Sequence, residues 1–441
     1  MSTLLKDTFC SSPWFHIRID PAGNFLPCRW GSHLDPTGYN IATTSILEFM
    51  NSDIMDGIRA RMLDGDRQAM CSACYYEDGL DKVSGRQRQL LKSAINIQNF
   101  DKTFCISPHW SNFEFSYKNA GRTTTQPVDL QIDLGNSCNS GCIMCSPKYS
   151  SRLATDYVAL NKIEPTIFAQ PNLGKNWADD PELVDKFVEE LAQIPNVRYI
   201  HFLGGETLYL KSFYNICNRL IESGLAKDIS LGTTTNCTVC SPDLERIIKE
   251  FKQVHLGLSV ESMHKINDYI RYPSNVDIVS TNIDTFIQLR KETNLHLALR
   301  ITPNIFSIYH LDTLFRLMLD DKITAESCDI LYTPSCLRIE LLPPELISEC
   351  LSRINQVIQD YQLVLDSDVI VNRRDDNVID PVITQVIFEY KHLLETIVAP
   401  ADVEDERYKL IKFIKAFEQL RNNTILEYLP EYEEFLRSYG Y

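Results

Sequence analysis

The sequence lacks any long apolar run. No stretch approaches the ~18 uninterrupted apolar residues that identify a membrane-spanning helix, so we expect no membrane partner. The first residues, MSTLLKDTFC, also lack the basic and then apolar pattern of a secretory signal, which predicts a cytoplasmic protein. Internal repeats and low-complexity tracts are missing as well. We therefore expect the 441 residues to form two to four ordinary globular domains.

Positive charge is also scarce. The chain has 43 Lys and Arg residues against 59 Asp and Glu residues, which gives a formal net charge of −16. A long nucleic-acid footprint depends on Lys and Arg side chains that contact phosphates. The charge balance therefore argues against a nucleic-acid partner.

Cysteine, in contrast, is abundant, with 14 residues. A long chain without a secretory signal is not expected to use them as a disulfide framework, and clustered spacing in a reducing compartment indicates metal or iron–sulfur ligation. Seven of the 14 fall into two groups. These are Cys138, Cys142 and Cys145, within GNSCNSGCIMCSP at 135–147, and Cys10, Cys28, Cys71 and Cys74 nearer the N-terminus.

The group of three directly follows a predicted strand, VDLQIDL at 128–134. A [4Fe–4S] cluster normally takes four thiolates, so three cysteines on one loop would leave one iron open to a small molecule. A zinc site with a distant fourth ligand is an alternative. Three unrelated buried cysteines are another. The spacing alone leaves these interpretations open.

From residue 128 onward, apolar strand-like segments alternate with amphipathic helices. The helix predicted at 181–194 has Asp180 as its N-cap and Pro181 as its first residue. This alternation predicts a parallel α/β sheet that forms a barrel or part of one, with polar motifs at the carboxyl ends of its strands. The strands are predicted at 128–134, 197–206, 229–236, 254–261 and 296–304, with a sixth strand and its pair within 328–342.

The spacing Cys-x3-Cys-x2-Cys after a first strand, followed by GGE at 204–206 after the second, resembles the signature of the radical S-adenosylmethionine (radical SAM) superfamily. The resemblance covers about residues 128–305. It implies that Cys138, Cys142 and Cys145 hold a [4Fe–4S] cluster whose open iron binds S-adenosylmethionine. It also implies an enzyme that reductively cleaves this cofactor to a 5′-deoxyadenosyl radical, which abstracts hydrogen from a substrate. A reductant such as flavodoxin or ferredoxin would supply the electron.

The resemblance extends to residues that contact the cofactor. Gly204, Gly205 and Glu206 match the segment that lines the methionine amino group, and Thr207 stands where many relatives have proline. Asn236 ends TTTN at the polar end of the third strand, which also resembles the family.

Two further residues match the family by their interval after the fourth strand. Ser259 and Arg271 are twelve residues apart, as are a serine and an arginine that contact the cofactor in relatives. The arginine would pair with the cofactor's carboxylate. Glu261 stands where relatives often carry aspartate, and Arg300 is a further polar residue at a strand end. The resemblance identifies no catalytic residue beyond the cluster.

The N-terminal cysteines have the pattern Cys-x12-Gly-x4-Cys and then Cys-x2-Cys, formed by Cys10, Gly23, Cys28, Cys71 and Cys74. This pattern resembles the twitch domain, a shortened SPASM domain, which here precedes the barrel. The resemblance implies a second, auxiliary [4Fe–4S] cluster. Four protein ligands would leave no open iron, which favours an electron-transfer or structural role.

Alternatives remain for the N-terminal group. Zinc could use four cysteines equally well. Cys10 is the least certain ligand, and His16 or His33 could replace it. A β-hairpin predicted around the PAGN turn at 21–24 would bring Cys10 and Cys28 together.

The other seven cysteines are interpreted as core or incidental residues. Cys237 and Cys240 form a CTVC pair, but no second pair has a sequence cue that places it nearby. The remaining five are Cys105, Cys217, Cys328, Cys336 and Cys350.

These patterns predict three regions: a twitch-like domain at 1–100 with a connector to 127, a radical SAM barrel at 128–342, and a helical region at 343–441. The fold class is α/β, a partial (βα)6 TIM-like barrel with an N-terminal cysteine-rich iron–sulfur domain. The substrate is expected to be a peptide or protein side chain. A small metabolite such as a sugar or nucleoside is the alternative, and a non-enzymatic iron–sulfur or zinc module is a remote one.

Overall fold

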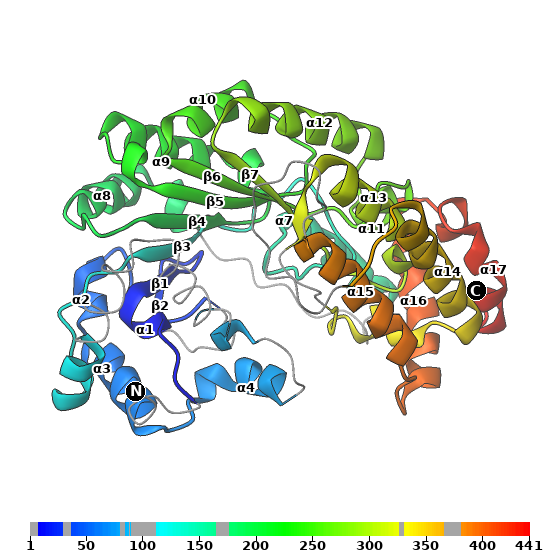
Figure 1. Cartoon of the computed structure of the whole chain (residues 1–441), viewed down its shortest axis with the longest axis horizontal. Helices are drawn as coiled ribbons and strands as arrows, with labels where there is room; N and C mark the ends of the chain where they lie inside the picture. Colours follow the sequence, from blue (N-terminus) through cyan, green and yellow to red (C-terminus); the bar gives the residue numbers. More distant parts are fainter. Residues whose placement is uncertain are drawn as a thin grey trace.

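The computed structural model describes residues 8–29, 37–79, 84–87, 89, 112–164, 176–325, 330–365 and 381–441. Its centre is one eight-stranded sheet with the strand order β2-β1-β3-β4-β5-β6-β7-β8. The N-terminal elements and the C-terminal helices lie at opposite ends of the molecule (Figure 1). The strands are β1 (His16–Ile19), β2 (Phe25–Leu26), β3 (Asp129–Asp133), β4 (Tyr199–Leu203), β5 (Ser230–Thr235), β6 (Gln253–Leu258), β7 (Leu295–Leu299) and β8 (Thr324–Ala325).

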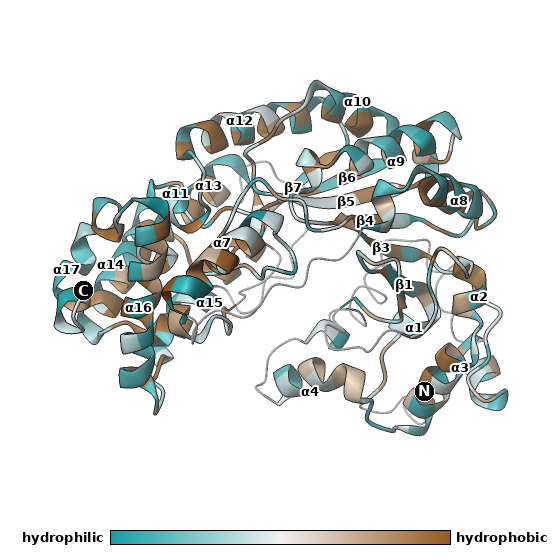
Figure 2. Cartoon of the chain, turned by 180° about the vertical axis from the view of Figure 1, so that it is seen from behind, coloured by the Kyte–Doolittle hydropathy of each residue, from teal (hydrophilic) through white to brown (hydrophobic). Residues whose placement is uncertain are grey.

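A layer of helices covers one face of the sheet, because every second residue of the central strands is apolar on that face. Ile200, Phe202 and Leu231 are fully buried there, and the ring of Phe202 lies 5.7 Å from the ring of Phe213 on α9. The helices of this layer mix hydrophobic and hydrophilic residues, as amphipathic helices do (Figure 2). They are α8 (Pro181–Ala192), α9 (Lys211–Glu222), α10 (Pro242–Glu250) and α12 (Val276–Glu292).

The opposite face of the sheet carries a row of polar residues. Gln131, His201, Gly232, His255 and His296 are direct register partners across five neighbouring strands. Register partners in a sheet project to the same side. The row therefore crosses the face that the helix layer leaves uncovered.

The predicted N-terminal hairpin is present. β1 and β2 are antiparallel, with Arg18 opposite Leu26. The turn between them includes Gly23, whose φ is +87°, and a Cβ at this position would lie 2.9 Å from Cγ2 of Ile41. Glycine is therefore required for the turn to pack closely on the next segment.

The hairpin does not stand apart from the predicted barrel. β1 pairs in parallel with β3, so one continuous sheet crosses the predicted boundary between 127 and 128. A buried ion pair reinforces this junction, with Nη2 of Arg18 lying 2.6 Å from Oδ2 of Asp133. Arg18 also donates to the carbonyl of Arg29 over 3.2 Å. The first barrel strand is thus covered at its edge by the N-terminal region.

The prediction of a sixth strand and its pair within 328–342 is wrong for the described part of that segment. The sixth strand counted from β3 is β8 at Thr324–Ala325, and residues 326–329 lie outside the described residues. The segment LRIELL forms short 3₁₀ turns instead, η6 (Ser335–Leu337) and η7 (Ile339–Leu341). Pro334 and Pro343 flank these turns, and proline cannot donate to a strand ladder.

Two capped helices follow the N-terminal hairpin. Ser45 and Glu48 form a reciprocal capping box at the start of α2, and the side chain of Ser52 accepts from the amide of Met55 at the start of α3. The N-terminal helices are α1 (Ser12–Phe15), α2 (Ile46–Met50), α3 (Asp53–Asp64) and α4 (Ser72–Asp78).

The C-terminal region is helical where it is described, as expected. The hydroxyl of Tyr432 donates to the carbonyl of Ile305 over 2.7 Å, which ties the last segment to the barrel. None of the described helices has the length and apolar character that crossing a membrane requires. The remaining helices are α7 (Ser151–Ile163), α11 (Ile266–Ile270), α13 (Asp312–Asp321), α14 (Pro344–Asp360), α15 (Pro381–Thr396), α16 (Val403–Arg421) and α17 (Glu433–Ser438).

Candidate functional site

The three-cysteine loop joins the carboxyl end of β3 to α7. α7 begins where Ser150 accepts from the amide of Leu153 over 3.0 Å. Neighbouring segments hold the loop by its backbone, because the amide of Gly141 donates to the carbonyl of Tyr272 over 2.6 Å and that of Ile143 donates to the carbonyl of Ile270 over 2.9 Å. The loop therefore has a defined path over α11 rather than extending into solvent.

The three thiols of this loop are neighbours. Burial raises the pKa of Cys138 and of Cys145 to about 12, and in both cases the nearby thiol of Cys142 adds to the rise. The amide of Ser140 points at Sγ of Cys138 over 3.4 Å. The guanidinium of Arg271 points at Sγ of Cys142 over 3.7 Å. Two of the three sulfurs thus accept hydrogen bonds, while Sγ of Cys145 donates to the carbonyl of Ser146 over 3.6 Å.

Gly205 lets the end of β4 approach this loop. A Cβ at Gly205 would lie 2.2 Å from the carbonyl oxygen of Ser137, and one at Gly204 would lie 2.8 Å from Cδ1 of Leu210. The amide of Glu206 donates to the same Ser137 carbonyl over 3.0 Å. Gly205 is therefore required by close packing of the GGE segment on the cysteine loop.

Glu206 and Asn236 connect three strand ends. Glu206 is buried and accepts from the backbone amides of Asn236 over 2.6 Å and Leu208 over 3.1 Å. Burial raises the pKa of Glu206, while the amide of Asn236 lowers it. The side chain of Asn236 donates to Oδ1 of Asn139 and Oγ of Ser140, each over 2.9 Å. Both predicted cofactor residues therefore contact the cysteine loop or its supporting strands.

Arg271 has a carboxylate partner within the chain. Its Nη2 lies 2.6 Å from Oε1 of Glu261, whose side chain is 1% exposed. Burial disfavours the Arg271 cation, but Glu261 and Cys142 outweigh this effect, so the pKa of Arg271 is raised. Since Arg271 contacts both Cys142 and Glu261, the structure places it beside the cysteine loop.

Ser259 and Arg300 lie at the ends of neighbouring strands. The amide of Ser259 donates to the carbonyl of Thr235 over 2.8 Å, and the amide of Arg300 donates to that of Leu258 over 2.9 Å. Both residues are half-buried. The strand-end residues that the sequence singled out therefore share the edge of the sheet that carries the cysteine loop.

The four N-terminal cysteines are buried together. Their exposed fractions are 6% to 8%, and the thiol of Cys28 raises the pKa of the other three. Burial is the largest cause, and the pKa reaches about 12 for Cys71 and about 11 for Cys74. Cys10 is part of this group, since Cys28, Cys71 and Cys74 all contribute to its raised pKa.

One of the two histidines proposed as replacements for Cys10 lies next to an aspartate. His16 lies on β1, and its Nδ1 is 3.4 Å from Oδ2 of Asp129 on the neighbouring strand. His33 lies outside the described residues. No three His, Cys, Asp or Glu side chains in the described ranges converge as a single metal ion would require.

The other cysteines behave as expected where they are described. Cys237 is fully buried, and its thiol donates to the carbonyl of Thr235 over 3.8 Å. Cys217, Cys336 and Cys350 are core residues with exposed fractions of 4% or less. Cys105 and Cys328 lie outside the described residues.

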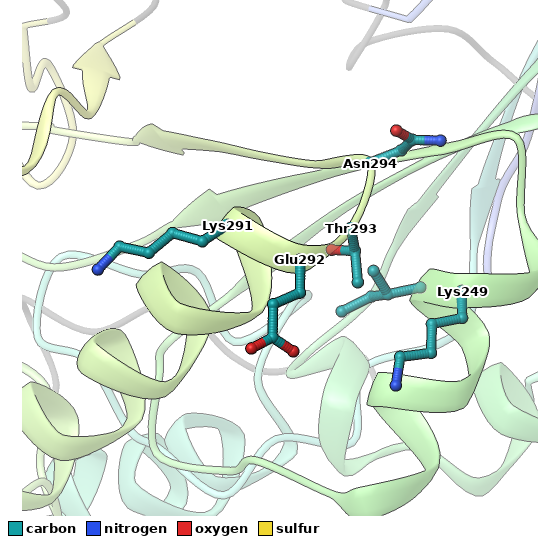
Figure 3. Close-up of a pocket in the computed structure, with 6 residues that line it drawn as sticks. Lys249, Lys291, Glu292, Thr293 and Asn294 are labelled. Atoms are coloured by element: carbon teal, nitrogen blue, oxygen red, sulfur yellow. The ribbon is translucent and has the colours of Figure 1, made fainter.

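A surface pocket lies at the opposite edge of the sheet. Its labelled residues come from the ends of α10 and α12 and the turn before β7 (Figure 3). Both of its lysines already have partners, because Lys249 pairs with Glu245 over 2.6 Å and Lys291 donates to Gln288 over 3.2 Å. This pocket is therefore not the candidate site.

One residue that contacts the cysteine loop has no signal in the sequence. Arg421, at the end of α16, donates to the carbonyl of Gly141 in the cysteine loop. The two residues are 280 positions apart, and an arginine on an amphipathic helix has no signal that distinguishes it from a solvated one. Only the fold brings them together.

A family model matches the central part of the chain. Residues 132–302 match the model of the Radical SAM superfamily. The chain therefore carries a radical SAM superfamily domain over these residues. A search of curated proteins gave no match.

Solved structures with a related arrangement include anSMEcpe with bound AdoMet, at 15% identity and a TM-score of 0.38 over 54% of this chain and 62% of that chain. Streptococcus suis SuiB bound to S-adenosylmethionine aligns at 12% identity and a TM-score of 0.38, over 81% of this chain and 71% of that one. The chain thus spans less than two thirds of the anSMEcpe structure.

The raised pKa values predict slow alkylation of the loop thiols in iron-free protein. With a pKa of about 12, the thiolate fraction of Cys138 and Cys145 at pH 8 is roughly a thousandfold below that of an unperturbed thiol. Iodoacetamide labelling, followed by peptide mass spectrometry, should therefore be slow at pH 8 and should accelerate up to pH 12. The same protein unfolded in urea is the control. Labelling of the folded protein at the unfolded rate would contradict the prediction.

Proposed function

We propose that this chain is a radical SAM enzyme with two [4Fe–4S] clusters, and that it abstracts hydrogen from a substrate. One observation carries the proposal: a loop with three cysteines follows the first strand of a matched radical SAM domain, at the edge where the GGE segment, Ser259 and Arg271 also lie. When bound, the cluster and S-adenosylmethionine supply a strongly oxidising radical at this edge.

The residues present fit a cluster at Cys138, Cys142 and Cys145. The amide of Ser140 donates to Sγ of Cys138, and the guanidinium of Arg271 donates to Sγ of Cys142. Both contacts stabilise thiolates. Two basic side chains, Arg271 and Arg421, lower the pKa of Cys142 against the effect of burial. These contacts partly offset burial, which raises the pKa of all three thiols.

The chain's own residues would hold the cofactor as follows. Gly205 lets the end of β4 pack directly on Ser137 of the cysteine loop. Glu206 and Asn236 fix the cysteine loop. Ser259 is a hydrogen-bonding group on the neighbouring strand end. Arg271 would contact the cofactor's carboxylate while it remains next to Glu261.

We further propose that Cys10, Cys28, Cys71 and Cys74 hold the auxiliary cluster. Their common burial and mutual effect on pKa support a shared site. With four protein ligands, this cluster would serve electron transfer or structure. The proposed substrate is a peptide or protein side chain, the proposed reductant is a flavodoxin or ferredoxin, and the proposed compartment is the cytoplasm.

Anaerobic reconstitution tests the function. About eight irons per chain are expected, as two [4Fe–4S] clusters. Dithionite and S-adenosylmethionine should then yield 5′-deoxyadenosine, which chromatography detects. Untargeted product analysis with candidate peptides would follow. Stable binding of zinc in place of iron at both sites would overturn the proposal.

Cys10→Ala should affect only the auxiliary site. Removing one of four ligands opens a coordination position, so the electron paramagnetic resonance signal of the auxiliary cluster should change and its iron should be lost more readily. Cleavage of S-adenosylmethionine with dithionite should persist, because the other cysteines are intact. Substrate turnover should fall more than this cleavage.

Cys217→Ala is the matched control, since Cys217 is a fully buried cysteine in the core of α9. This variant should retain the electron paramagnetic resonance signals of both clusters. If Cys10→Ala also leaves the auxiliary signal and the iron count unchanged, the fourth ligand lies elsewhere.

A further inference from the structure

Arg421 reaches from the C-terminal helical region into the cysteine loop. It is the last residue of α16, and Asn422 ends the helix with a φ of +52°. Its Nη2 donates to the carbonyl of Gly141 and lies 2.9 Å from Oδ2 of Asp156 on α7. One guanidinium nitrogen thus joins α16, α7 and the loop.

Gly141 is held from both sides of its peptide unit. Its amide donates to Tyr272 and its carbonyl accepts from Arg421. A Cβ at Gly141 would lie 2.9 Å from Oδ2 of Asp156 and 3.1 Å from Nη2 of Arg421. The close approach of the arginine therefore depends on a glycine between Cys138 and Cys142.

The guanidinium is also enclosed. The side chain of Arg421 is 3% exposed, and its Cζ lies 4.7 Å from the ring centre of Tyr272 and 4.4 Å from that of Phe417. Aromatic faces on both sides hold the plane of a guanidinium in position. A buried cation of this kind has a fixed place relative to the loop.

Its charge lies next to Cys142, because the carbonyl that it contacts belongs to Gly141, the preceding residue. The guanidinium of Arg271 points at Sγ of Cys142 over 3.7 Å. Arg271 lies on the barrel side, in the segment after α11, and Arg421 belongs to the C-terminal region. The loop is therefore placed between two cations that come from distant parts of the chain.

We propose that Arg421 is a positioning residue for the cysteine loop, which fixes the Gly141 carbonyl and adds a second buried cation beside Cys142. The C-terminal region would thereby complete the cluster site instead of only covering the barrel. The electrostatic part of this inference rests on the proposed function. The backbone part does not, because the contact to Gly141 is present without iron.

Hydrogen exchange of the iron-free full-length chain tests the backbone part. A hydrogen bond from a charged donor is strong enough that Arg421→Gln should speed amide exchange in the peptide covering 138–145 by about tenfold or more. Arg407→Gln is the matched control. Arg407 lies on the same helix and stacks on Phe435 and Tyr439. Its hydrogen bonds go to Leu341, Glu404 and Tyr439, none of which belongs to the cysteine loop. Equal exchange in the two variants would overturn the proposal.

The midpoint potential of the reconstituted cluster at this loop tests the electrostatic part. Reduction adds one electron from dithionite to the cluster, and a nearby cation favours the more negative reduced state. Arg421→Gln should shift the potential in the negative direction, and Arg407→Gln should leave it unchanged. Arg421→Lys should retain the wild-type potential, because it keeps the charge, but should still speed exchange, because an amine cannot reproduce the planar stacked contact. An unchanged potential in Arg421→Gln would overturn the electrostatic part.

The hydrogen-exchange and midpoint-potential measurements distinguish a failure of the proposed function from a failure of the proposed role of Arg421. If wild-type protein takes up no iron, the proposed function fails while hydrogen exchange still decides the role of Arg421. If Arg421→Gln does not fold, Arg421→Lys and Asp156→Asn replace it. Both should speed exchange at 138–145, and wild-type exchange in both would overturn the proposal.

Discussion

Replacing Cys138, Cys142 and Cys145 together by Ala is expected to leave about four irons per chain and to abolish 5′-deoxyadenosine formation. The loop would keep its backbone contacts to Tyr272 and Ile270, since these involve no cysteine side chain. The variant should therefore fold while it loses every thiolate of this site. Iron analysis and chromatography of the anaerobic reaction measure the two results.

A second triple variant controls for the loss of buried thiols. Cys217, Cys336 and Cys350 are also buried, and they belong to neither cysteine group. Replacing these three by Ala should preserve about eight irons and the cleavage reaction. Retention of cleavage in the first variant, or loss of iron in the second, would contradict the assignment of the loop.

Arg271→Ala should weaken binding of S-adenosylmethionine at least tenfold and should also destabilise the protein. Glu261 is 1% exposed, and removal of its partner leaves a buried carboxylate without a counterion. Breaking a buried pair in this way lowers the free energy of unfolding by about 3–5 kcal/mol. Equilibrium dialysis measures the binding and urea denaturation measures the stability.

Two further variants separate binding from stability. The double variant Arg271→Met with Glu261→Leu removes both charges and should recover most of the stability, while binding stays weak. Arg59→Ala breaks another buried pair, with Asp56 on α3, and should destabilise the protein without weakening the cofactor's affinity. Wild-type affinity in Arg271→Ala would show that the arginine has no contact with the cofactor.

The fold of the central region was predictable because its information is local. The helix predicted from Asp180 and Pro181 begins there, and five predicted strands coincide with β3 to β7. The pairing of β1 with β3 was not predictable, since it joins residues more than 100 positions apart. The error at 328–342 has a local cause. The buried apolar residues of this segment lie next to prolines and form 3₁₀ turns instead of a strand. The strand that does form, β8, has only two residues, which is too short for a recognisable pattern.

The site shows the same division. Three cysteines on one loop and a GGE segment at a strand end are recognisable from spacing alone. The pairing of Glu261 with Arg271 could not be predicted, because it depends on the geometry of their side chains in the folded chain. Arg421 depends on the packing of α16 against α7, and no pattern within α16 reveals it.

The order of the sheet has a consequence for solubility. A strand at the edge of a sheet exposes unpaired amides and carbonyls and can recruit a strand from another molecule. Without β1, the five-residue strand β3 would stand at such an edge, directly before the cysteine loop. In the described sheet the two outer strands are β2 and β8, and each has only two residues. Short edge strands offer little template for intermolecular pairing, so the N-terminal hairpin protects the barrel sheet against edge-to-edge aggregation.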